Sequence, residues 1–362
     1  MHIIAQKLIR WYGENQRDLP WRRTTDPYKI WVSEIILQQT RVEQGRAYYL
    51  RFLNAFPDVN ALAKADQQQV LKTWQGLGYY SRARNMHQAA KTIATKFNGV
   101  FPDNYQDILS LKGIGEYTAG AVASFAYNLP YPAVDGNVLR VLARLFDVHE
   151  KINTASGVKK IKKITESLLP KEDPATFNQS LIEFGALWCT PKKPACLSCP
   201  LQQHCLAFTH NTVESLPAKK PKKKPQDRYL NYLVIKDEDQ RTLYLRKRID
   251  SRDIWENLYD FPLIESKKPI SPEELVNTSE WKILIGHNYR FLSKNPRKKK
   301  HQLSHQTLHA LFWEVQIDDS FDLSDKKMII SDYTENLYRY PFPKLIDGYL
   351  KENIIEYKKN TK

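Results

Sequence analysis

The chain has 362 residues, with 55 Lys and Arg against 40 Asp and Glu and a formal net charge of +15. This length exceeds that of one hydrophobic core, so we expect two or three domains, and the charge favours a polyanionic partner, with nucleic acid ahead of an anionic membrane surface. The N-terminus has no apolar core of signal-peptide length, and no apolar run reaches the ~20 residues that span a bilayer. We therefore expect a cytoplasmic, nucleoid-associated protein rather than a secreted or membrane one.

Residues 1 to about 215 carry apolar side chains at spacings of three and four, which predicts a helical region. Asp26-Pro27 has the residue types of a helix cap and first helical position, and a long helix is predicted to follow over residues 30–53. The other predicted helices cover residues 59–77, 81–97, 104–111, 116–127, 137–146 and 177–189.

Glu34 is the only charged residue between Lys29 and Arg41. A carboxyl group among Ile, Val, Trp and Leu loses hydration, which disfavours its charged form and raises its pKa toward neutrality. Such a group could donate a proton. The plain alternative is a glutamate on the solvent face of a helix.

The segment LSLKGIGEYTAG, residues 109–120, places Gly113 and Gly115 on either side of Ile114, directly before a predicted helix. Two glycines allow a sharp turn with positive φ, and a helix start offers free N–H groups, so this turn could bind a phosphate. Asp135 stands before the next predicted helix, where a cap or an Asp-Gly turn is the plain interpretation.

All four cysteines lie between residues 189 and 205 and are separated by six, two and five residues. A reducing compartment argues against disulfides, whereas four thiolates in a short loop suit structural zinc or a [4Fe–4S] cluster. Only Cys196 and Cys199 form the C-x₂-C pair that zinc sites usually repeat. The spacing of the other two, Cys189 and Cys205, therefore favours the cluster.

Residues 217–228 are rich in lysine and proline and predict a solvated linker. Beyond the linker the apolar period changes to two, which predicts a smaller α+β domain over residues 229–362. Predicted strands cover residues 229–237, 242–248, 281–291 and 308–317, and an amphipathic helix is predicted over 344–359. The basic run 296–300 is interpreted as a loop that faces phosphates or is merely solvated.

The cysteine spacing and the glycine turn, found in one chain, resemble the endonuclease III family of DNA glycosylases. The segment SEIILQQT, residues 33–40, resembles the adenine-specific members of the MutY type within that superfamily. The resemblance implies an all-α helix-hairpin-helix core with an iron–sulfur loop, followed by a C-terminal α+β Nudix-like domain. The glycosylase domain would be residues 1–216, with a six-helix module at about 25–133 and a cluster module from 1–24 and 134–216.

By this resemblance Glu34 protonates the adenine ring and Asp135 stabilises the sugar cation as the base leaves. The bifunctional members carry a lysine nucleophile where this chain has Tyr117, and a phenol cannot form an imine, so base removal should leave an abasic site. Asn137 matches a further pocket position. The positions that match DNA contacts are Arg22, Gln39, Leu77, Tyr79, Gly113, Gly115, Lys192 and Lys193.

The C-terminal half resembles the domain with which MutY-type proteins recognise 8-oxoguanine. Leu303, Ser304 and His305 align with a Phe-Ser-His recognition loop, and the departure at Leu303 removes a ring contact with the lesion. The glutamate-rich, metal-binding helix of Nudix hydrolases has no counterpart here. Metal-dependent hydrolysis by this domain is therefore not expected.

The expected partner is duplex DNA with adenine opposite 8-oxoguanine or guanine. We also expect a monomer, with contacts to repair proteins through the linker. A mismatch thymine glycosylase of the same superfamily is the nearest alternative enzyme. A redox-responsive DNA-binding regulator that uses the cluster as a sensor is the alternative from another class.

Overall fold

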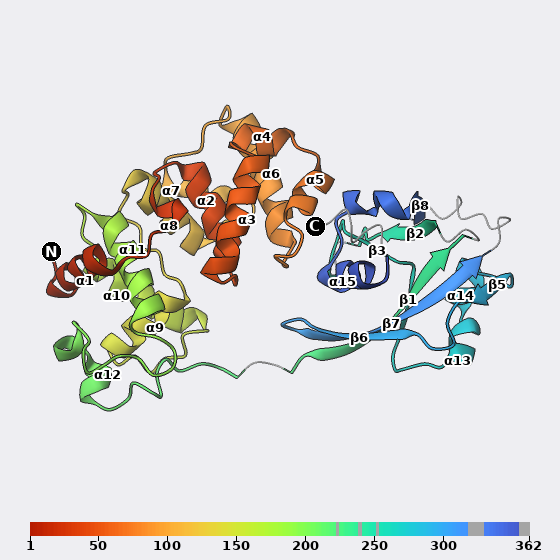
Figure 1. Cartoon of the computed structure of the whole chain (residues 1–362). Helices are drawn as coiled ribbons and strands as arrows, with labels where there is room; N and C mark the ends of the chain where they lie inside the picture. The colour runs from red at the N-terminus through yellow and green to blue at the C-terminus, as the bar shows by residue number, and fades with distance from the viewer. Residues whose placement is uncertain (222–223, 238–240, 251–252, 318–328, 355–362) are drawn as a thin grey trace. The chain divides into compact units, whose positions relative to one another are not determined.

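The computed structural model describes residues 1–221, 224–237, 241–250, 253–317 and 329–354. The chain divides into two compact units (Figure 1). The first unit comprises Met1–Ala65 and Asn85–Pro221, and the second comprises Asp66–Arg84 and Lys222–Lys362. In the part of the chain that the structure describes, no helix has the length and apolarity needed to cross a membrane.

Helices account for the regular structure of the described chain up to residue 209. Their bounds are α1 Ile3–Asn15, η1 Pro20–Arg22, α2 Pro27–Leu37, α3 Val42–Ala55, α4 Val59–Lys64, α5 Gln67–Thr73, α6 Ser81–Lys96, α7 Tyr105–Ser110, α8 Glu116–Tyr127, α9 Gly136–Leu145, α10 Ala155–Leu168, α11 Pro174–Leu187, η2 Gln202–His204 and α12 Leu206–Thr209. The predicted helical character of this region is confirmed.

The helix starts follow local chemistry. Asp26 accepts hydrogen bonds from the N–H groups of Tyr28 and Lys29, and Pro27 is the first residue of α2, so the predicted cap is confirmed. The long helix predicted over 30–53 is wrong, because Gln39 adopts a φ of +57° and separates α2 from α3. The helix predicted over 59–77 is also wrong, because Asp66 caps a new helix, α5.

The core of the first unit joins its N-terminal and later helices. Apolar residues of α1, α9 and α11 pack together, and the cysteine-bearing loop packs against the same cluster. Because α9 is buried along one face, its N-terminal residues are held in a fixed position relative to α11. That fixed helix end supports the cavity described below.

The second unit is built on a sheet with strand order β3-β2-β1-β7-β5, with β4 paired to β1, β6 to β7 and β8 to β2. The long central strands β1 and β7 run parallel. The bounds are β1 Gln226–Lys236, β2 Thr242–Lys247, β3 Tyr259–Asp260, β4 Leu263–Ser266, α13 Pro272–Val276, α14 Ser279–Leu284, β5 Tyr289–Phe291, β6 Arg297–Gln302, β7 Gln306–Ile317, β8 Ile329–Tyr333, η3 Thr334–Arg339 and α15 Lys344–Asn353.

Each face of this sheet has its own core. Even-numbered residues of β1 and β7, such as Tyr232 and Phe312, pack with α15, whereas odd-numbered residues, such as Leu233 and Trp313, pack with α13 and α14. Figure 1 shows α15 on one side of the sheet and α13 with α14 on the other. The predicted α+β character of the C-terminal half is thus confirmed.

Two details of the predicted second unit are wrong. Residues 281–291 are not one strand, because the Thr278 side chain accepts a hydrogen bond from the Trp281 N–H and starts α14, and only Tyr289–Phe291 forms a strand. The basic run 296–300 is not a loop, since residues from Arg297 onward pair antiparallel with β7. The predicted closing helix is present as α15, and residues 355–359 of that prediction lie outside the described residues.

Candidate active site

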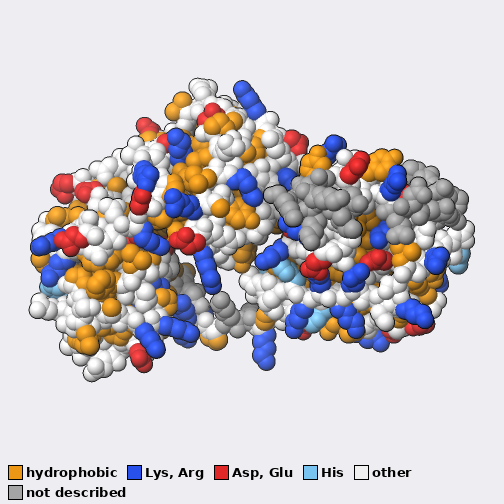
Figure 2. All heavy atoms as spheres, in the orientation of Figure 1, with side chains coloured by type: hydrophobic (Ala, Val, Ile, Leu, Met, Phe, Trp, Pro, Cys, Tyr) orange, Lys and Arg blue, Asp and Glu red, His pale blue; other side chains and the backbone are white. Residues whose placement is uncertain are grey.

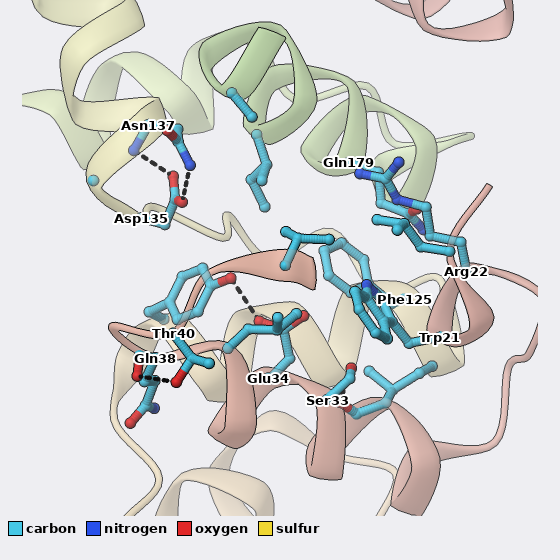
Figure 3. Close-up of a pocket in the computed structure, with 18 of the residues that line it drawn as sticks. Trp21, Arg22, Ser33, Glu34, Gln38, Thr40, Phe125, Asp135, Asn137 and Gln179 are labelled. Carbon is cyan, nitrogen blue, oxygen red and sulfur yellow. Dashed lines mark hydrogen bonds between the residues drawn. The ribbon is translucent and has the colours of Figure 1, made fainter. Parts of the chain in front are cut away.

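The first unit contains a cavity of about 580 Å³ (Figure 3). Its walls come from η1, α2 and the loop that follows, α8, the start of α9, and α11. Of the predicted site residues, it is lined by Arg22, Glu34, Gln39, Tyr117, Asp135 and Asn137. The fold therefore brings side chains that are more than one hundred positions apart in the sequence, such as Arg22 and Asn137, to the same cavity.

Glu34 lies on α2 and is only 8% exposed. The Tyr117 hydroxyl on α8 donates a hydrogen bond of 2.5 Å to Glu34 Oε2. Burial raises the pKa of Glu34 to about 7; the Tyr117 hydrogen bond opposes this rise, and the charge of Asp135 adds to it. A substantial fraction of Glu34 therefore carries a proton at neutral pH, as the sequence predicts.

Asp135 is the N-cap of α9, as its plain sequence interpretation predicts. Its Oδ1 accepts hydrogen bonds of 2.8 Å from the N–H groups of Asn137 and Val138, and its Oδ2 accepts one of 2.7 Å from Asn137 Nδ2. Burial raises the pKa of Asp135, and these hydrogen bonds oppose the rise. All three donors are N–H groups at the positive end of a helix, so they favour the carboxylate.

Tyr117 remains a neutral donor in this setting. Burial and the neighbouring carboxyls of Glu34 and Asp135 raise the pKa of Tyr117 well above its ordinary value. Its hydroxyl therefore keeps its proton and holds Glu34 in one orientation. No amine nucleophile stands at this position.

A buried ion cluster beside the cavity was not predicted from the sequence. Glu183 on α11 is fully buried and accepts paired hydrogen bonds of 2.6–2.9 Å from Arg17 and Arg22. Burial by itself would raise the pKa of Glu183, but these hydrogen bonds and the charge of Arg22 outweigh burial and lower the pKa to about 2. Glu183 is the lone charged residue in the apolar stretch FNQSLIEFGALW, a signal of the same kind as that of Glu34.

The predicted glycine turn lies between α7 and α8. Gly113 has a φ of +80°, and a Cβ there would meet Asn85 Cβ at 2.6 Å, so this position requires glycine. Gly115 caps α8 with a φ of −98°, and nothing lies within 4 Å of a Cβ built on it. The expectation of positive φ is therefore correct for Gly113 and wrong for Gly115.

The four cysteines line one small cavity with apolar neighbours, including Val141, Phe184 and Leu201. All are free thiols. Four sulfur donors around one apolar space fit a soft, thiophilic centre such as an iron–sulfur cluster. Among the described residues, no three or more His, Cys, Asp or Glu side chains are grouped closely enough to hold a metal ion.

Two arginines of α9 bind this loop, and one of them, Arg140, also binds a residue of the cavity. Arg140 donates hydrogen bonds to Asn137 Oδ1 at 3.0 Å and to the Cys189 carbonyl at 2.8 Å. Arg144 donates to Cys189 Sγ at 3.4 Å and to the Thr190 carbonyl at 2.7 Å. Asn137, which binds Asp135, is therefore one side chain away from the cysteine loop.

The remaining predicted residues lie outside this cavity. Leu77 and Tyr79 belong to the segment that packs with the second unit, where the Tyr79 hydroxyl lies 2.7 Å from Ser304 Oγ. Leu303 packs against a core of that unit, whereas Ser304 and His305 are exposed. Lys192 and Lys193 are exposed beside the cysteine loop.

Comparison with known proteins adds family relationships to this geometry. Residues 32–171 match the family described as HhH-GPD superfamily base excision DNA repair protein. The chain is 36% identical over 309 residues to "Adenine DNA glycosylase" of Buchnera aphidicola subsp. Acyrthosiphon pisum (strain APS), covering 85% of each chain. It is 37% identical over 214 residues to the protein of that name from Mus musculus, covering 57% of this chain and 42% of the mouse protein.

The fold is also similar to solved structures. A thermostable thymine-DNA glycosylase matches with a TM-score of 0.54 and 28% identity, over 57% of this chain and 96% of the other. An endonuclease III in a non-covalent DNA complex matches with a TM-score of 0.50 and 22% identity, over 58% of this chain and 95% of the other, which shows a shared fold.

Proposed function

Because the chain belongs to the adenine DNA glycosylases and removes adenine in base excision repair, we propose that its substrate is adenine mispaired with 8-oxoguanine or guanine. We further propose that it cleaves only the glycosidic bond. The observation that carries the proposal is a protonatable Glu34, held by Tyr117, in the same cavity as the capped Asp135.

The reaction needs the nucleotide outside the helix. Extrusion of a base costs about a few kcal/mol, and the residues that would enter the base stack are Gln39, Leu77 and Tyr79. The cavity volume of about 580 Å³ is adequate for one purine. Arg22, fixed by Glu183, would line the pocket around the extruded base.

The two carboxyl groups, Glu34 and Asp135, then have different roles in cleavage of the glycosidic bond. Glu34 donates its proton to a ring nitrogen of adenine, so that the electrons of the glycosidic bond leave with a neutral base. The Asp135 carboxylate stabilises the positive sugar, or bonds to it transiently, until water adds at the anomeric carbon. Tyr117 offers no amine to form an imine, so the product is an abasic site in an uncut strand.

Support for a cofactor comes from the cysteine loop. Cys189, Cys196, Cys199 and Cys205 would hold a [4Fe–4S] cluster, which would rigidify the loop beside Lys192 and Lys193 and take no part in bond cleavage. The turn at Gly113 and Gly115 would bind a backbone phosphate at the start of α8.

We assign the check of the opposite base to a Nudix-like domain over residues 229–362, through Ser304 and His305. Residues 1–216 would form the glycosylase domain and 217–228 the linker, which offers a site for repair proteins. We also propose that the protein acts as a monomer on nucleoid DNA in the cytoplasm.

The test is single-turnover cleavage of end-labelled duplexes with A opposite 8-oxoguanine, A opposite G, A opposite T and T opposite G, each with and without hot alkali. Strand breaks only after alkali, fastest for A opposite 8-oxoguanine, are the expected result. Breaks without alkali would contradict the monofunctional mechanism, and excision of T would instead support the thymine glycosylase alternative. Duplex binding without any excision by cluster-loaded protein would support the redox-responsive regulator.

A further inference from the structure

The second unit contains a cavity of about 610 Å³ that the proposed function does not use. It lies over adjacent strands of the sheet, in the order β4-β1-β7-β6. Tyr229 pairs with Ser266 on one side and with His309 on the other, and His309 pairs with Lys300. These residues line the cavity, which we call the sheet-face pocket.

The pocket exists because the helices cover only part of this face. Leu233, Ile235 and Val315 pack against α13 and α14 farther along the strands. Near the start of β1 the walls are instead Pro269 and the first residue of α13, Pro272, on one side and Pro296, just before β6, on the other. The floor therefore stays open to a ligand.

The floor is aromatic and well fixed. The rings of Tyr229 and His309 stack with centroids 4.9 Å apart and planes 17° apart, and His309 Nε2 lies 2.7 Å from Asp227 Oδ1. Asn231 is buried and donates hydrogen bonds to the Ile264 carbonyl and Ser266 Oγ, while it accepts one from Trp313 Nε1. On the side of Tyr229 away from His309, its cross-strand neighbour in the pocket lining is the small residue Ser266.

The charge on β6 differs between the two faces of the sheet. Arg297 pairs with Glu314 at 3.1 Å and Lys299 with Glu352 at 2.6 Å. All three lysines of β6 contribute to the pocket lining, but Lys298 and Lys300, unlike Lys299, are exposed and form no ion pair with a described carboxylate. Within the described part of the chain, the ammonium groups of Lys298 and Lys300 are thus not compensated by a carboxylate.

We propose that the sheet-face pocket binds a nucleotide, either free or as a unit of an exposed DNA strand. The base continues the Tyr229–His309 stack, and the phosphate lies between Lys298 and Lys300. Base stacking on aromatic side chains is a common, sequence-tolerant mode of nucleotide binding, and pockets of about 300–1,000 Å³ suit ligands of this size. The site is separate from the Ser304 loop, because Leu303 packs in the core on the opposite face of the sheet.

The test is equilibrium dialysis of the full-length protein with radiolabelled dGMP and, separately, with an oligothymidine 12-mer. Neither probe contains adenine, so neither is a substrate for excision. The pocket variants are Lys298→Glu/Lys300→Glu and Tyr229→Ala. The matched control is Lys282→Glu/Lys294→Glu, which changes net charge equally at exposed lysines of the same unit that do not line the pocket.

We expect each pocket variant to lose at least tenfold in affinity for a probe, and the control less than twofold. Loss for both probes indicates that a mononucleotide suffices, whereas loss for the oligonucleotide alone indicates a DNA strand. Adenine excision from a saturating duplex should continue in all variants, which separates this site from the catalytic cavity. Native melting temperatures will show that the variants are folded, and Lys298→Arg/Lys300→Arg, which keeps both charges, should bind the probes as the wild type does. Equal binding by the pocket and control variants overturns the proposal.

Discussion

Glu34 and Asp135 are both buried carboxyls beside one cavity, and burial raises the pKa of each, but the hydrogen-bond donors that oppose this rise differ between them. Glu34 lies among apolar side chains and accepts a hydrogen bond from Tyr117, and its pKa rises to about 7. Asp135 accepts three hydrogen bonds from N–H donors at a helix start. Such a pair can supply an acid and a stabilising anion in the same step.

The pH dependence of excision should follow the proton on Glu34. The protonated fraction falls as pH rises through about 7, so the single-turnover rate constant should fall with it. The Tyr117 hydroxyl stabilises the carboxylate, and its removal in Tyr117→Phe should move the midpoint to higher pH. Rate profiles of both proteins over neutral pH would show this; a flat profile, or a midpoint that moves lower, would contradict the role of Glu34.

At the scale of one element, α9 holds residues of the cavity at its start and binds the cysteine loop farther along. Its N-cap is Asp135, its first turn holds Asn137, and its buried Arg140 and Arg144 bind the cysteine loop. A single, largely buried helix therefore positions both the Asp135 carboxylate and the cysteine loop. The negative charge of Asp135 and its role as helix cap can nevertheless be tested separately, because asparagine caps a helix without a charge.

Asp135→Asn should retain the fold and lose the chemistry. An asparagine oxygen caps a helix about as well as aspartate, but its amide nitrogen cannot accept the hydrogen bond from Asn137 Nδ2, so the unfolding free energy should fall by only about 1–2 kcal/mol. Loss of the negative charge should lower the excision rate constant by about 10²–10³. Chemical denaturation and single-turnover assays measure the two effects, with Asp58→Asn, at the exposed cap of α4, as the control. Retained excision would remove Asp135 from the mechanism.

The buried ion cluster on α11 should be a large stabilising feature. Glu183→Gln leaves Arg17 and Arg22 without their carboxylate, and such losses cost about 3–5 kcal/mol. The folded-state pKa of Glu183 is depressed to about 2, so its contribution is present above the ordinary value of 4.5 and is lost as pH falls through about 2. The difference in unfolding free energy between wild type and variant should therefore shrink below about pH 4.5.

Denaturant titrations at neutral and acidic pH measure this difference. Glu150→Gln removes an exposed carboxylate that pairs with Lys160 and should change stability little. A variant as stable as wild type at neutral pH would show that the cluster serves specificity rather than stability.

At the scale of the whole molecule, a net charge of +15 spreads over both units, and Figure 2 shows Lys and Arg side chains on each of them. The two proposed tasks, base removal and inspection of the opposite base, fall in different units. The segment Asp66–Arg84 leaves the helical unit to pack with the sheet unit, and there Tyr79 meets Ser304. This segment therefore connects the two units covalently, as does the linker at residues 221–222.

Ser304→Ala should weaken discrimination without changing the chemistry. Loss of one hydrogen bond to the lesion costs about 1 kcal/mol, so the preference for 8-oxoguanine over guanine should fall about fivefold. Adenine excision opposite guanine should keep its rate under single-turnover conditions. Ser279→Ala, an exposed serine on α14, is the control. An equal fall in both rates would instead indicate a general defect in DNA binding.

Local patterns were enough to predict many elements and several individual residues. The Asp26-Pro27 start of α2, the helix Glu116–Tyr127, the strand through residues 308–317 and the buried charge of Glu34 all depend on nearby side chains and on periodicity. Local patterns failed where a single residue breaks a regular period. Gln39, with its left-handed φ, interrupts an apolar pattern that reads as one helix.

The sequence by itself therefore determined the two kinds of secondary structure, the family resemblance and the candidate acid, because these follow from neighbouring residues and short motifs. Only the tertiary structure decided that Tyr117 binds Glu34, that Glu183 fixes Arg22 and that Lys298 and Lys300 have no carboxylate partner among the described residues. Such contacts join residues far apart in the chain, and their energies depend on burial and on distances that packing alone sets.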